Sequence, residues 1–465
     1  MLVPITILFS VRYVVRTGLL ERLARSCEPV LALSWDDPDL VEELGAAGVE
    51  VVRLPEPRVD APTLALLHLL EVHFLRRLAS PSTPIDRARR HVGRSRSVRA
   101  RRWASWQRTR LRTLAPGHEA RVRAELAAAV PTGTNLDENR RFLADHRIDA
   151  VFSVTPFTEQ ERVVLLAAEA AGLPACTSIL SFDNITTRPP LPIRFHRYLV
   201  WNAFNRDEVL RGYPGVGAHQ VEVVGPAQFD FYRDPAYVED RTRWRARSGL
   251  GEHPVVLYGA GPPEVAPHEA QHVQHLCDAV DRGELPADLR ILVRRHPVDW
   301  PGRWERFAHH PAVVIDDPGR VGDTPGRPGQ VGIGHDQIVG LCSTLAHTDV
   351  HVNVSSTLTL DGAFFHKPQI GPAYDVADGR RFHRTARDLY RREHFLPIVA
   401  SGGLEVPSTP EELVAAVARA LADPGRLEPQ RRAMLDALCT YTDGRCTERV
   451  AAAVEDFLRH HLGAG

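Results

Sequence analysis

The most chemically suggestive stretch of this chain is a run of small hydroxyl side chains that follows a β-branched segment. Residues 350–354 are Val-His-Val-Asn-Val, an alternation that predicts a strand, and a polar turn and a helix-like run come after it. The side chains concerned are Ser355, Ser356, Thr357 and, about one helical turn further on, Asp361. Hydroxyls and backbone N–H groups at a helix start suit a phosphate or diphosphate, and a carboxylate there suits ribose hydroxyls. An ordinary helix cap at Ser355 accounts for the same pattern, so both interpretations stay open.

A second anion-binding pattern ends another apolar run, residues 291–293. The guanidinium groups of Arg294 and Arg295 can hold a phosphoryl group, and the imidazole of His296 can contact that group or give it a proton. Pro297 restricts His296 to extended geometry and fixes where the chain leaves the strand. A surface arginine–histidine turn is the simpler alternative, and the residues alone leave it open.

A third candidate is a short glycine-rich stretch after the apolar run 254–258. Gly259 and Gly261 stand in the sequence Gly-Ala-Gly-Pro-Pro, which lacks the third glycine of a dinucleotide-binding fingerprint. The two prolines also remove N–H donors. The stretch is therefore a poor signal for a dinucleotide cofactor, but it predicts a tight turn where backbone can approach a ligand.

Polar residues also follow two strand-like runs in the first half of the chain. Asp183 suits a general base, and its neighbours Asn184 and Thr186 suit a hydroxyl-rich acceptor. An Asx-turn explains the Asp-Asn pair equally well. Asp36 follows an earlier strand, at the edge where open α/β sheets bind ligands, although the Asp-Pro pair at 37–38 is also an ordinary helix start.

Short apolar runs alternate with helix-like runs along the chain, which predicts parallel sheets with helices on both faces. A length of 465 residues exceeds what one core usually covers, and the charged, turn-prone segment 231–251 predicts a linker. We therefore expect an α/β protein with two Rossmann-like domains, residues 1–235 and 236–465. A Gly/Pro-rich loop is expected at 317–334, and a last strand at 397–400.

Composition excludes several classes of protein. The formal net charge is −1, so no overall field favours nucleic acid. The six cysteines show no CxxC pair and no metal-like spacing, and we expect neither a metal nor a cofactor. The first apolar run is too short to span a bilayer and is expected as a buried strand rather than a signal peptide. We expect a cytoplasmic protein.

The segment 84–123 departs from the near-neutral charge of the whole chain, because it contains thirteen arginines and only two acidic residues. Four apolar side chains can share one helical face there: Trp103, Trp106, Leu111 and Leu114. A basic helix with such a face can lie on the inner face of an anionic membrane or hold an anionic, lipid-linked acceptor. A solvated helical excursion that packs its tryptophans on the domain is the alternative.

Four motifs taken in order resemble the two-domain GT-B glycosyltransferases. More narrowly, they resemble the branch of capsule- and wall-polymer glycosyltransferases and CDP-glycerol glycerophosphotransferases. The motifs are the Arg-x-His-Pro strand end at 294–297, the Val-Asn-Val-Ser-Ser-Thr helix start at 352–357, the exit from the first domain, from Trp201-Asn202 through 223–230, and the stretch 441–449, which is similar to a terminal Asp-Gly-x-(Ser/Thr)-x-Arg helix. The resemblance covers most of residues 140–455.

This resemblance implies the GT-B fold, with two parallel sheets facing across a cleft and C-terminal helices that pack back toward the first domain. It further implies that the second domain binds the donor and the first binds the acceptor, without an essential metal. The hydroxyl turn at 355–357 would hold the donor diphosphate, and Asp361 would contact the ribose. His296 would contact the donor phosphate or the leaving group. Asp183 is the expected acceptor-side base, with Asp36 behind it.

The function expected from the sequence is transfer of a sugar from a nucleotide-sugar donor to a hydroxyl of a glycan, lipid-linked intermediate or metabolite. One alternative keeps the fold but transfers a polyol phosphate from a CDP-linked donor. Another, a nucleotide-sugar 2-epimerase, is less favoured because the sequence does not present the paired acids and histidines that it needs. An alternative from a different class is a catalytically silent GT-B protein that acts as a partner or scaffold.

Overall fold

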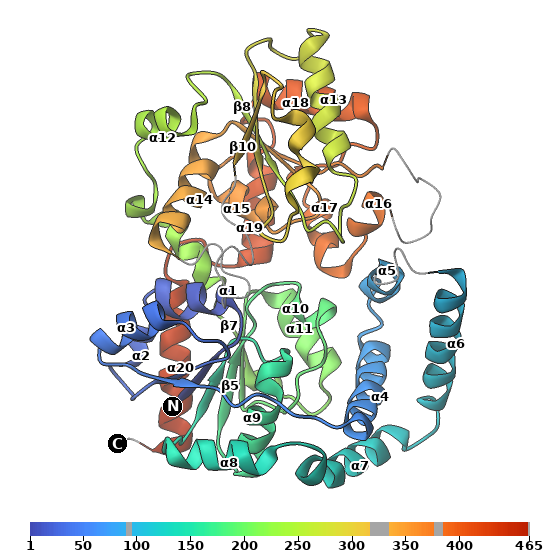
Figure 1. Ribbon diagram of the computed structural model, residues 1–465, viewed down its shortest axis with the longest axis vertical. Helices are drawn as coiled ribbons and strands as arrows, with labels where there is room; N and C mark the ends of the chain where they lie inside the picture. The colour runs from blue at the N-terminus through green and yellow to red at the C-terminus, as the bar shows by residue number, and fades with distance from the viewer. Residues whose placement is uncertain (90–94, 317–333, 376–384, 464–465) are drawn as a thin grey trace. The chain divides into compact units, whose positions relative to one another are not determined.

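The structure is a computed structural model of the whole chain, and it describes residues 1–89, 95–316, 334–375 and 385–463 (Figure 1). Apart from Gly334, the Gly/Pro-rich loop expected at 317–334 lies outside the described residues. The chain forms two compact units, each with its own buried core. The first consists of Met1–Thr83, His91–Ala227 and Cys446–Gly465, and the second of Pro84–Arg90 and Gln228–Arg445.

The first unit is built on a parallel sheet of seven strands in the order β3-β2-β1-β4-β5-β6-β7. The strands are β1 (Leu2–Ile5), β2 (Val30–Leu33), β3 (Glu50–Arg53), β4 (Val151–Ser153), β5 (Ala175–Ser178), β6 (Arg197–Val200) and β7 (Val221–Val223). The chain moves outward from β1 to β3 and restarts at β4 on the other side of β1. Such a reversal of order opens a crevice at the carboxyl ends of the two central strands.

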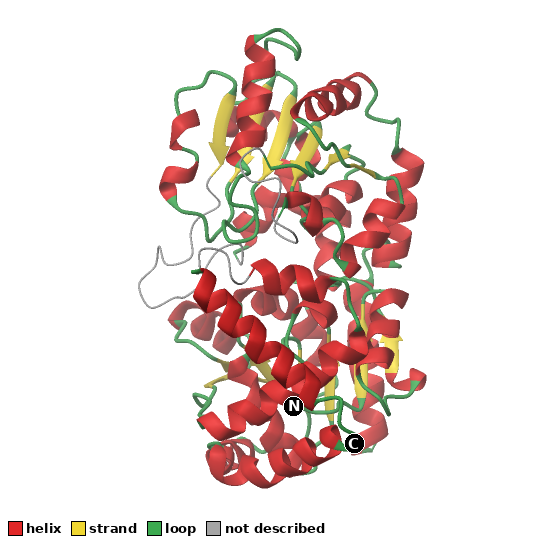
Figure 2. Cartoon of the chain, turned by 90° about the vertical axis from the view of Figure 1, so that its right-hand side faces the viewer, coloured by secondary structure: helices red, strands yellow, loops and turns green. Residues whose placement is uncertain are grey.

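Helices cover both faces of this sheet (Figures 1 and 2). The helices of this unit are α1 (Leu8–Val11), α2 (Leu19–Leu23), α3 (Pro38–Ala46), α4 (Ala61–Leu78), α6 (Arg96–Arg112), α7 (His118–Gly133), α8 (Leu136–Asp145), α9 (Glu159–Ala170), α10 (Asn184–Thr187), α11 (Ala203–Gly212) and α20 (Cys446–Leu462). The central strands β1, β4 and β5 are buried along their whole length because they are covered on both sides.

The last helix, α20, packs in the first unit although the chain reaches it only after the second. It contacts α2 and the strands β5 and β6. Two ion pairs join it to that unit, Arg22 to Glu448 at 3.3 Å and Arg197 to Asp456 at 3.0 Å. The expectation that the end of the chain packs on the first domain is therefore confirmed.

The second unit holds a parallel sheet of six strands in the order β10-β9-β8-β11-β12-β13. The strands are β8 (Val255–Gly259), β9 (Arg290–Arg294), β10 (Val313–Asp316), β11 (Val350–Asn353), β12 (Gln369–Ile370) and β13 (Leu404–Glu405). The order reverses between β8 and β11, as it does between β1 and β4 in the first sheet. Each unit is therefore Rossmann-like, and the predicted α/β architecture is confirmed.

The helices of the second unit are α12 (Arg241–Ser248), α13 (Ala270–Asp281), α14 (His335–His347), α15 (Leu358–Phe364), α16 (Ala386–Leu389), α17 (Leu396–Ala400), α18 (Pro410–Ala422) and α19 (Glu428–Cys439), together with most of α5 (Ser82–Arg89). The predicted strand at 397–400 is wrong, because these residues form α17 and the strand β13 follows it. A four-residue apolar run fits either structure, and Pro397 fits the first turn of a helix.

Three of the four apolar side chains expected on one face of the basic segment are exposed. The side chains of Trp103, Leu111 and Leu114 are more than half exposed, at 62%, 65% and 57%. Within the described residues, no helix combines the length and the apolar character that crossing a membrane requires.

Candidate functional site

Strand register gathers three of the sequence candidates at one edge of the second sheet. Gly259, the last residue of β8, pairs with Asn353 of β11 on one side and with Arg294 of β9 on the other. The hydroxyl turn at 355–357 and His296 follow these strands directly. This edge is the carboxyl end of the sheet at the point where the strand order reverses, which is where ligands bind in open α/β sheets.

The hydroxyl turn has a backbone conformation that side chains rarely adopt. Ser355 has a φ of 47°, in the left-handed region, at a cost of roughly 1 kcal/mol or more for a residue with a Cβ. The hydroxyl of Tyr390 fastens the turn, because it accepts a bond from the Ser355 N–H and donates one to the Asn353 carbonyl, each at 3.3 Å. Strain of this kind persists only where the surroundings impose it.

The same turn corrects the helix-cap interpretation of Ser355. The cap position of α15 is Thr357, without a side-chain cap bond, and α15 is only seven residues long. The Ser355 hydroxyl donates instead to the Leu389 carbonyl at 3.4 Å. The Ser356 hydroxyl accepts from the Leu358 N–H at 3.2 Å. The Ser355 and Ser356 N–H groups already donate to the Tyr390 hydroxyl and the Asn353 side chain, so the turn offers an anion its hydroxyls rather than the field of a long helix.

Asp361 lies in the first turn of α15 and is 8% exposed. Its carboxylate accepts a hydrogen bond from the Tyr232 hydroxyl at 3.0 Å. The Tyr232 ring lies among aromatic neighbours, with centroids 5.1 Å from Phe229 and 5.6 Å from Phe364. A ribose hydroxyl at Asp361 would therefore have to share this carboxylate with Tyr232.

The three residues of the arginine–histidine motif are all at least partly buried. Arg294 forms an ion pair with Asp316 on the neighbouring strand, and Arg295 is 7% exposed. The His296 Nδ1 accepts the backbone N–H of Val298 at 3.2 Å, and burial lowers the pKa of His296 below its usual value. A neutral imidazole of this tautomer carries its proton on Nε2, from which it can donate to an anionic oxygen.

A buried charge network, which the sequence did not reveal, holds the glycine turn and His296 in place. The Glu269 carboxylate accepts the Gly261 N–H at 2.8 Å and pairs with Arg303 at 2.8 Å. Arg303 also donates to the Gly261 carbonyl at 3.0 Å and pairs with Asp299 at 3.3 Å. The Asp299 N–H bonds the His296 carbonyl at 2.8 Å. Burial raises the pKa of Glu269 to about 7 against the opposing effect of Arg303.

Packing explains the absence of a side chain at Gly259. A Cβ there would lie 2.1 Å from the Leu358 Cδ2 atom, so a larger residue would have to displace the Leu358 side chain from the end of β8. The only earlier signal for the network around Gly261 is the sequence Asp-Trp-Pro-Gly-Arg-Trp at 299–304, directly after the His-Pro pair.

The acceptor-side candidates lie in the first unit and are not neighbours. Asp183 precedes α10, and its two carboxylate oxygens accept from Asn184 at 3.2 Å and Thr187 at 3.1 Å. The Thr186 hydroxyl donates to the Asp183 carbonyl at 3.2 Å. Asp36 is on the surface, 3.3 Å from Arg53. Asp36 follows β2 and Asp183 follows β5, three strand spacings away in the sheet order, or roughly 14 Å.

The neighbour of Asp36, Asp37, is a helix cap, as the Asp-Pro pair indicated. Its carboxylate accepts the Leu40 N–H at 3.2 Å and the Trp35 indole N–H at 3.3 Å. The role of Asp37 is therefore structural, because it starts α3.

A hydroxyl-lined carboxyl group occupies the point where the strand order of the first sheet reverses. Glu161 is completely buried and accepts hydrogen bonds from Thr6, Ser153 and Thr155. Thr6 also lies 2.8 Å from Thr155, hydroxyl to hydroxyl, and so joins the ends of β1 and β4. Burial raises the pKa of Glu161 to about 7. The sequence shows little sign of this, because Glu161 stands in the polar first turn Glu-Gln-Glu-Arg of α9.

Among the described residues, no group of three or more histidine, cysteine, aspartate and glutamate side chains could hold a metal ion. The chemistry available at the edge of the second sheet is therefore that of arginine, imidazole, hydroxyl and backbone N–H groups. These groups bind and neutralise phosphate oxygens.

No protein-family model and no curated protein sequence matches the chain. Solved structures do share its fold. A co-structure of S. aureus MnaA with UDP has a TM-score of 0.56 at 13% identity and covers 98% of this chain and 96% of that chain. The UDP-GlcNAc 2-epimerase of Neisseria meningitidis bound to UDP-GlcNAc has a TM-score of 0.55 at 9% identity and covers 98% and 99%. A glycosyltransferase of Rickettsia africae has a TM-score of 0.52 at 11% identity and covers 100% and 98%.

At these identities the likeness establishes the fold alone. The chain has the GT-B fold, with two Rossmann-like units built on the seven-stranded and six-stranded sheets.

Proposed function

We propose that this protein is a glycosyltransferase that moves a sugar from a uridine nucleotide-sugar to a hydroxyl acceptor. The observation that carries the proposal is the register of the second sheet. It brings the glycine turn, the arginine–histidine motif and the strained hydroxyl turn to one edge, through the pairing of Gly259 with both Asn353 and Arg294. An edge of this composition suits a nucleoside diphosphate.

The donor chemistry follows from these groups. The hydroxyls of the turn at 355–357 bind the diphosphate oxygens, and the His296 Nε2–H donates to the leaving phosphate. Asp361 receives a ribose hydroxyl beside Tyr232. The bond between the sugar C1 and the phosphate oxygen breaks as C1 bonds to the acceptor oxygen. Negative charge then develops on the leaving nucleotide, where the donors of this edge stabilise it.

On the acceptor side, Asp183 takes the proton of the attacking hydroxyl. Asn184 and Thr186 bind further acceptor hydroxyls, and Asp36 is the alternative base. Asn184 and Thr187 already donate to the two Asp183 carboxylate oxygens, which orients the carboxylate for this role.

The uridine nucleotide is proposed because two of the structures with this fold hold UDP or UDP-GlcNAc. The same comparison favours a second candidate, a nucleotide-sugar 2-epimerase, because one of them is a UDP-GlcNAc 2-epimerase. The two reactions differ in one simple respect: the transferase needs an acceptor and releases UDP, whereas the epimerase converts the nucleotide-sugar alone.

The proposal is tested by thermal unfolding of the purified protein with UDP, UDP-sugars, CDP-glycerol and other nucleotides. A ligand at about 100 times its Kd stabilises the native state by about 2.7 kcal/mol. We expect UDP and UDP-sugars to raise the melting temperature. The double variant Ser355→Ala/Ser356→Ala should lose this shift. The control Ser248→Ala should keep it, because Ser248 ends α12, before β8 begins, in the same unit.

Product analysis then separates the alternatives. UDP released only when an acceptor is added supports the transferase, and a 2-epimer formed without an acceptor supports the epimerase. A response confined to CDP-glycerol supports the polyol-phosphate transferase of the branch that the sequence resembles. No response to any nucleotide would refute the donor site and leave the silent partner as the better explanation.

A further inference from the structure

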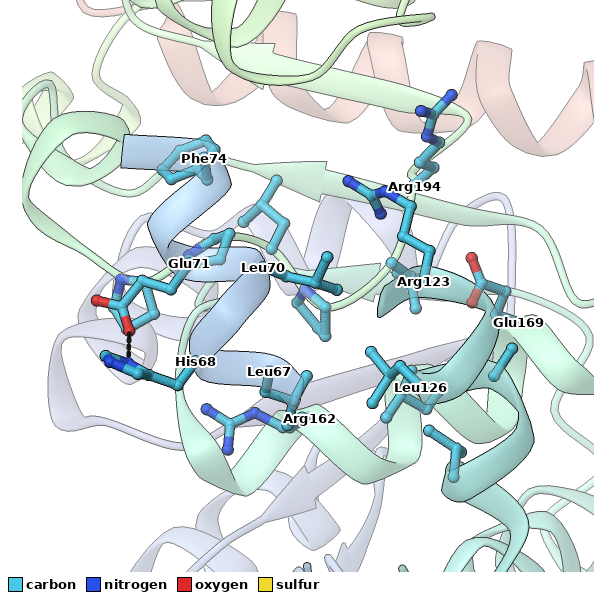
Figure 3. Close-up of a pocket in the computed structure, with 18 of the residues that line it drawn as sticks. Leu67, His68, Leu70, Glu71, Phe74, Arg123, Leu126, Arg162, Glu169 and Arg194 are labelled. Carbon is cyan, nitrogen blue, oxygen red and sulfur yellow. Dashed lines mark hydrogen bonds and ion pairs between the residues drawn. The ribbon is translucent and has the colours of Figure 1, made fainter. Parts of the chain in front are cut away.

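A cavity of about 600 Å³ lies inside the first unit, away from the residues discussed so far (Figure 3). Its walls come from α4, α7, α9 and the proline-rich segment 189–194. None of the candidate donor or acceptor residues lines it. The volume falls in the range of pockets that hold small organic ligands.

The walls of this cavity are mainly aliphatic. They include Leu67, Leu70, Leu126, Leu166, Leu191 and Ile193. Leu67 and Leu70 of α4 pack against the buried core yet stay only partly buried themselves, because the open side of α4 faces the cavity. An aliphatic chain gains from burial against these walls.

The arginines around the cavity differ in whether they already have an ionic partner. Arg77 and Arg123 both pair with Glu119, the second at 2.8 Å, and Arg194 interacts electrostatically with Glu169. Arg162 of α9 lines the cavity, but its guanidinium has no hydrogen bond or ion pair to another described residue. Because Arg162 is partly exposed at the cavity wall, its guanidinium can pair with an anionic group of a ligand.

The spacing of these groups places an apolar stretch of the cavity wall next to Arg162. Arg162 lies in the first half of α9 and Glu169 at its other end. They are seven residues apart, or about 10 Å along the helix. Leu166 lies between them. A ligand that binds Arg162 can therefore extend an aliphatic chain along α9, over the leucines of α4.

We propose that this cavity holds the aliphatic chain of a single-chain anionic amphiphile, with its carboxylate or phosphate head group on Arg162. The site is separate from the proposed donor chemistry and does not depend on it. A fatty carboxylate and a lipid monophosphate both combine an anionic head group with an aliphatic chain. Their relative affinities for the cavity distinguish between them.

The first test is calorimetric titration of the full chain with alkyl phosphates and alkyl carboxylates of eight to fourteen carbons, below their micelle-forming concentrations. Saturable binding of one ligand per chain is expected. Each added methylene should raise the affinity about fourfold until the cavity is full, after which the gain should stop. The tighter of the two series at equal chain length identifies the head group. Absent or non-saturable binding overturns the proposal.

Variants place the ligand in the cavity. Leu70→Trp fills the space and should weaken dodecyl phosphate binding at least tenfold. The control Val41→Trp adds the same side chain at an exposed position of α3 outside the cavity and should leave binding unchanged. Unaltered binding by the folded Leu70→Trp protein overturns the assignment of the cavity.

Arg162→Gln tests the head group without threatening the fold, because Arg162 supports no other described side chain. It should weaken dodecyl phosphate binding about tenfold or more and leave dodecanol binding unchanged. Equal effects on the charged and uncharged ligands would show that Arg162 does not hold the head group.

Discussion

Replacing Glu161 with glutamine should remove a loss of folding stability that occurs as the pH rises. In the folded state burial raises the pKa of Glu161 from 4.5 to about 7. The folded protein therefore binds this proton more tightly than the unfolded chain, and its stability falls as the pH rises from about 4.5 to about 7. A shift of 2.5 pKa units at 1.36 kcal/mol per unit gives a loss of about 3 kcal/mol, complete above pH 7.

Glutamine suits this site because it resembles the protonated acid. Its carbonyl oxygen can accept from the hydroxyls of Thr6 and Thr155, and its amide can donate to Ser153. The variant should therefore keep the packing where β1 and β4 end. It should gain stability relative to the wild-type protein as the pH rises, by most of the 3 kcal/mol between pH 5 and pH 8.

The assay is urea unfolding of both proteins at pH 5, 6, 7 and 8. The free-energy difference between them is the informative quantity, because other groups with raised pKa values, such as Glu269, cancel in it. Glu43→Gln is the control, since the Arg16 hydrogen bond lowers the pKa of Glu43. Its contribution is complete above about pH 4.5, so the same difference should be flat from pH 5 to pH 8. A flat difference for Glu161→Gln, or one of opposite sign, would refute the reasoning.

Further predictions concern the second unit and the basic segment. Ser355→Gly should be more stable than Ser355→Ala by roughly 1 kcal/mol in thermal unfolding, because glycine relieves the left-handed φ. Arg303→Met should cost roughly 3–5 kcal/mol by leaving Glu269 and Asp299 buried without their cation, whereas Arg282→Met should leave the urea midpoint unchanged. Burial lowers the pKa of His351 to about 3, so the free energy of unfolding should fall as the pH drops below 6.5, by up to about 1.4 kcal/mol per pH unit. In His351→Gln the urea midpoint should therefore change less between pH 4 and pH 6 than in the wild-type protein. The intact protein should sediment with anionic vesicles at low salt, and Trp103→Ser should weaken this; failure to bind would remove the proposed membrane contact.

The two sheets were predictable because strand identity in a parallel sheet is a local property. Each buried strand is a short apolar run between turn residues, and the helices between them supply a second periodicity. The run at 397–400 shows the limit of this argument. Four apolar residues do not distinguish a strand from a helical turn, and the surroundings decided for the helix α17.

The candidate site was predictable in composition but not in arrangement. The sequence places Arg294, His296 and the turn at 355–357 after strands, but only the strand order brings them to one edge on either side of Gly259. The left-handed φ of Ser355 has no local signal, because it depends on Tyr390, thirty-five residues away.

The buried carboxyl groups were not predictable for the same physical reason. Glu161 is stable in the core because Thr6, 155 residues earlier in the chain, donates to it. Glu269 depends on Arg303, 34 residues later. In the sequence both glutamates resemble ordinary solvated residues near a helix start, and only tertiary contact shows that they are buried and paired.

The position of α20 has a consequence for how the protein is made. Residues 1–227 leave the ribosome well before the helix that packs on β5 and β6, because the whole of Gln228–Arg445 lies between them in the chain. At typical elongation rates this interval lasts on the order of 10–40 s. During that time the nascent first unit must display the apolar surface that α20 later covers. A chain truncated before residue 446 should therefore leave this apolar surface exposed and should aggregate.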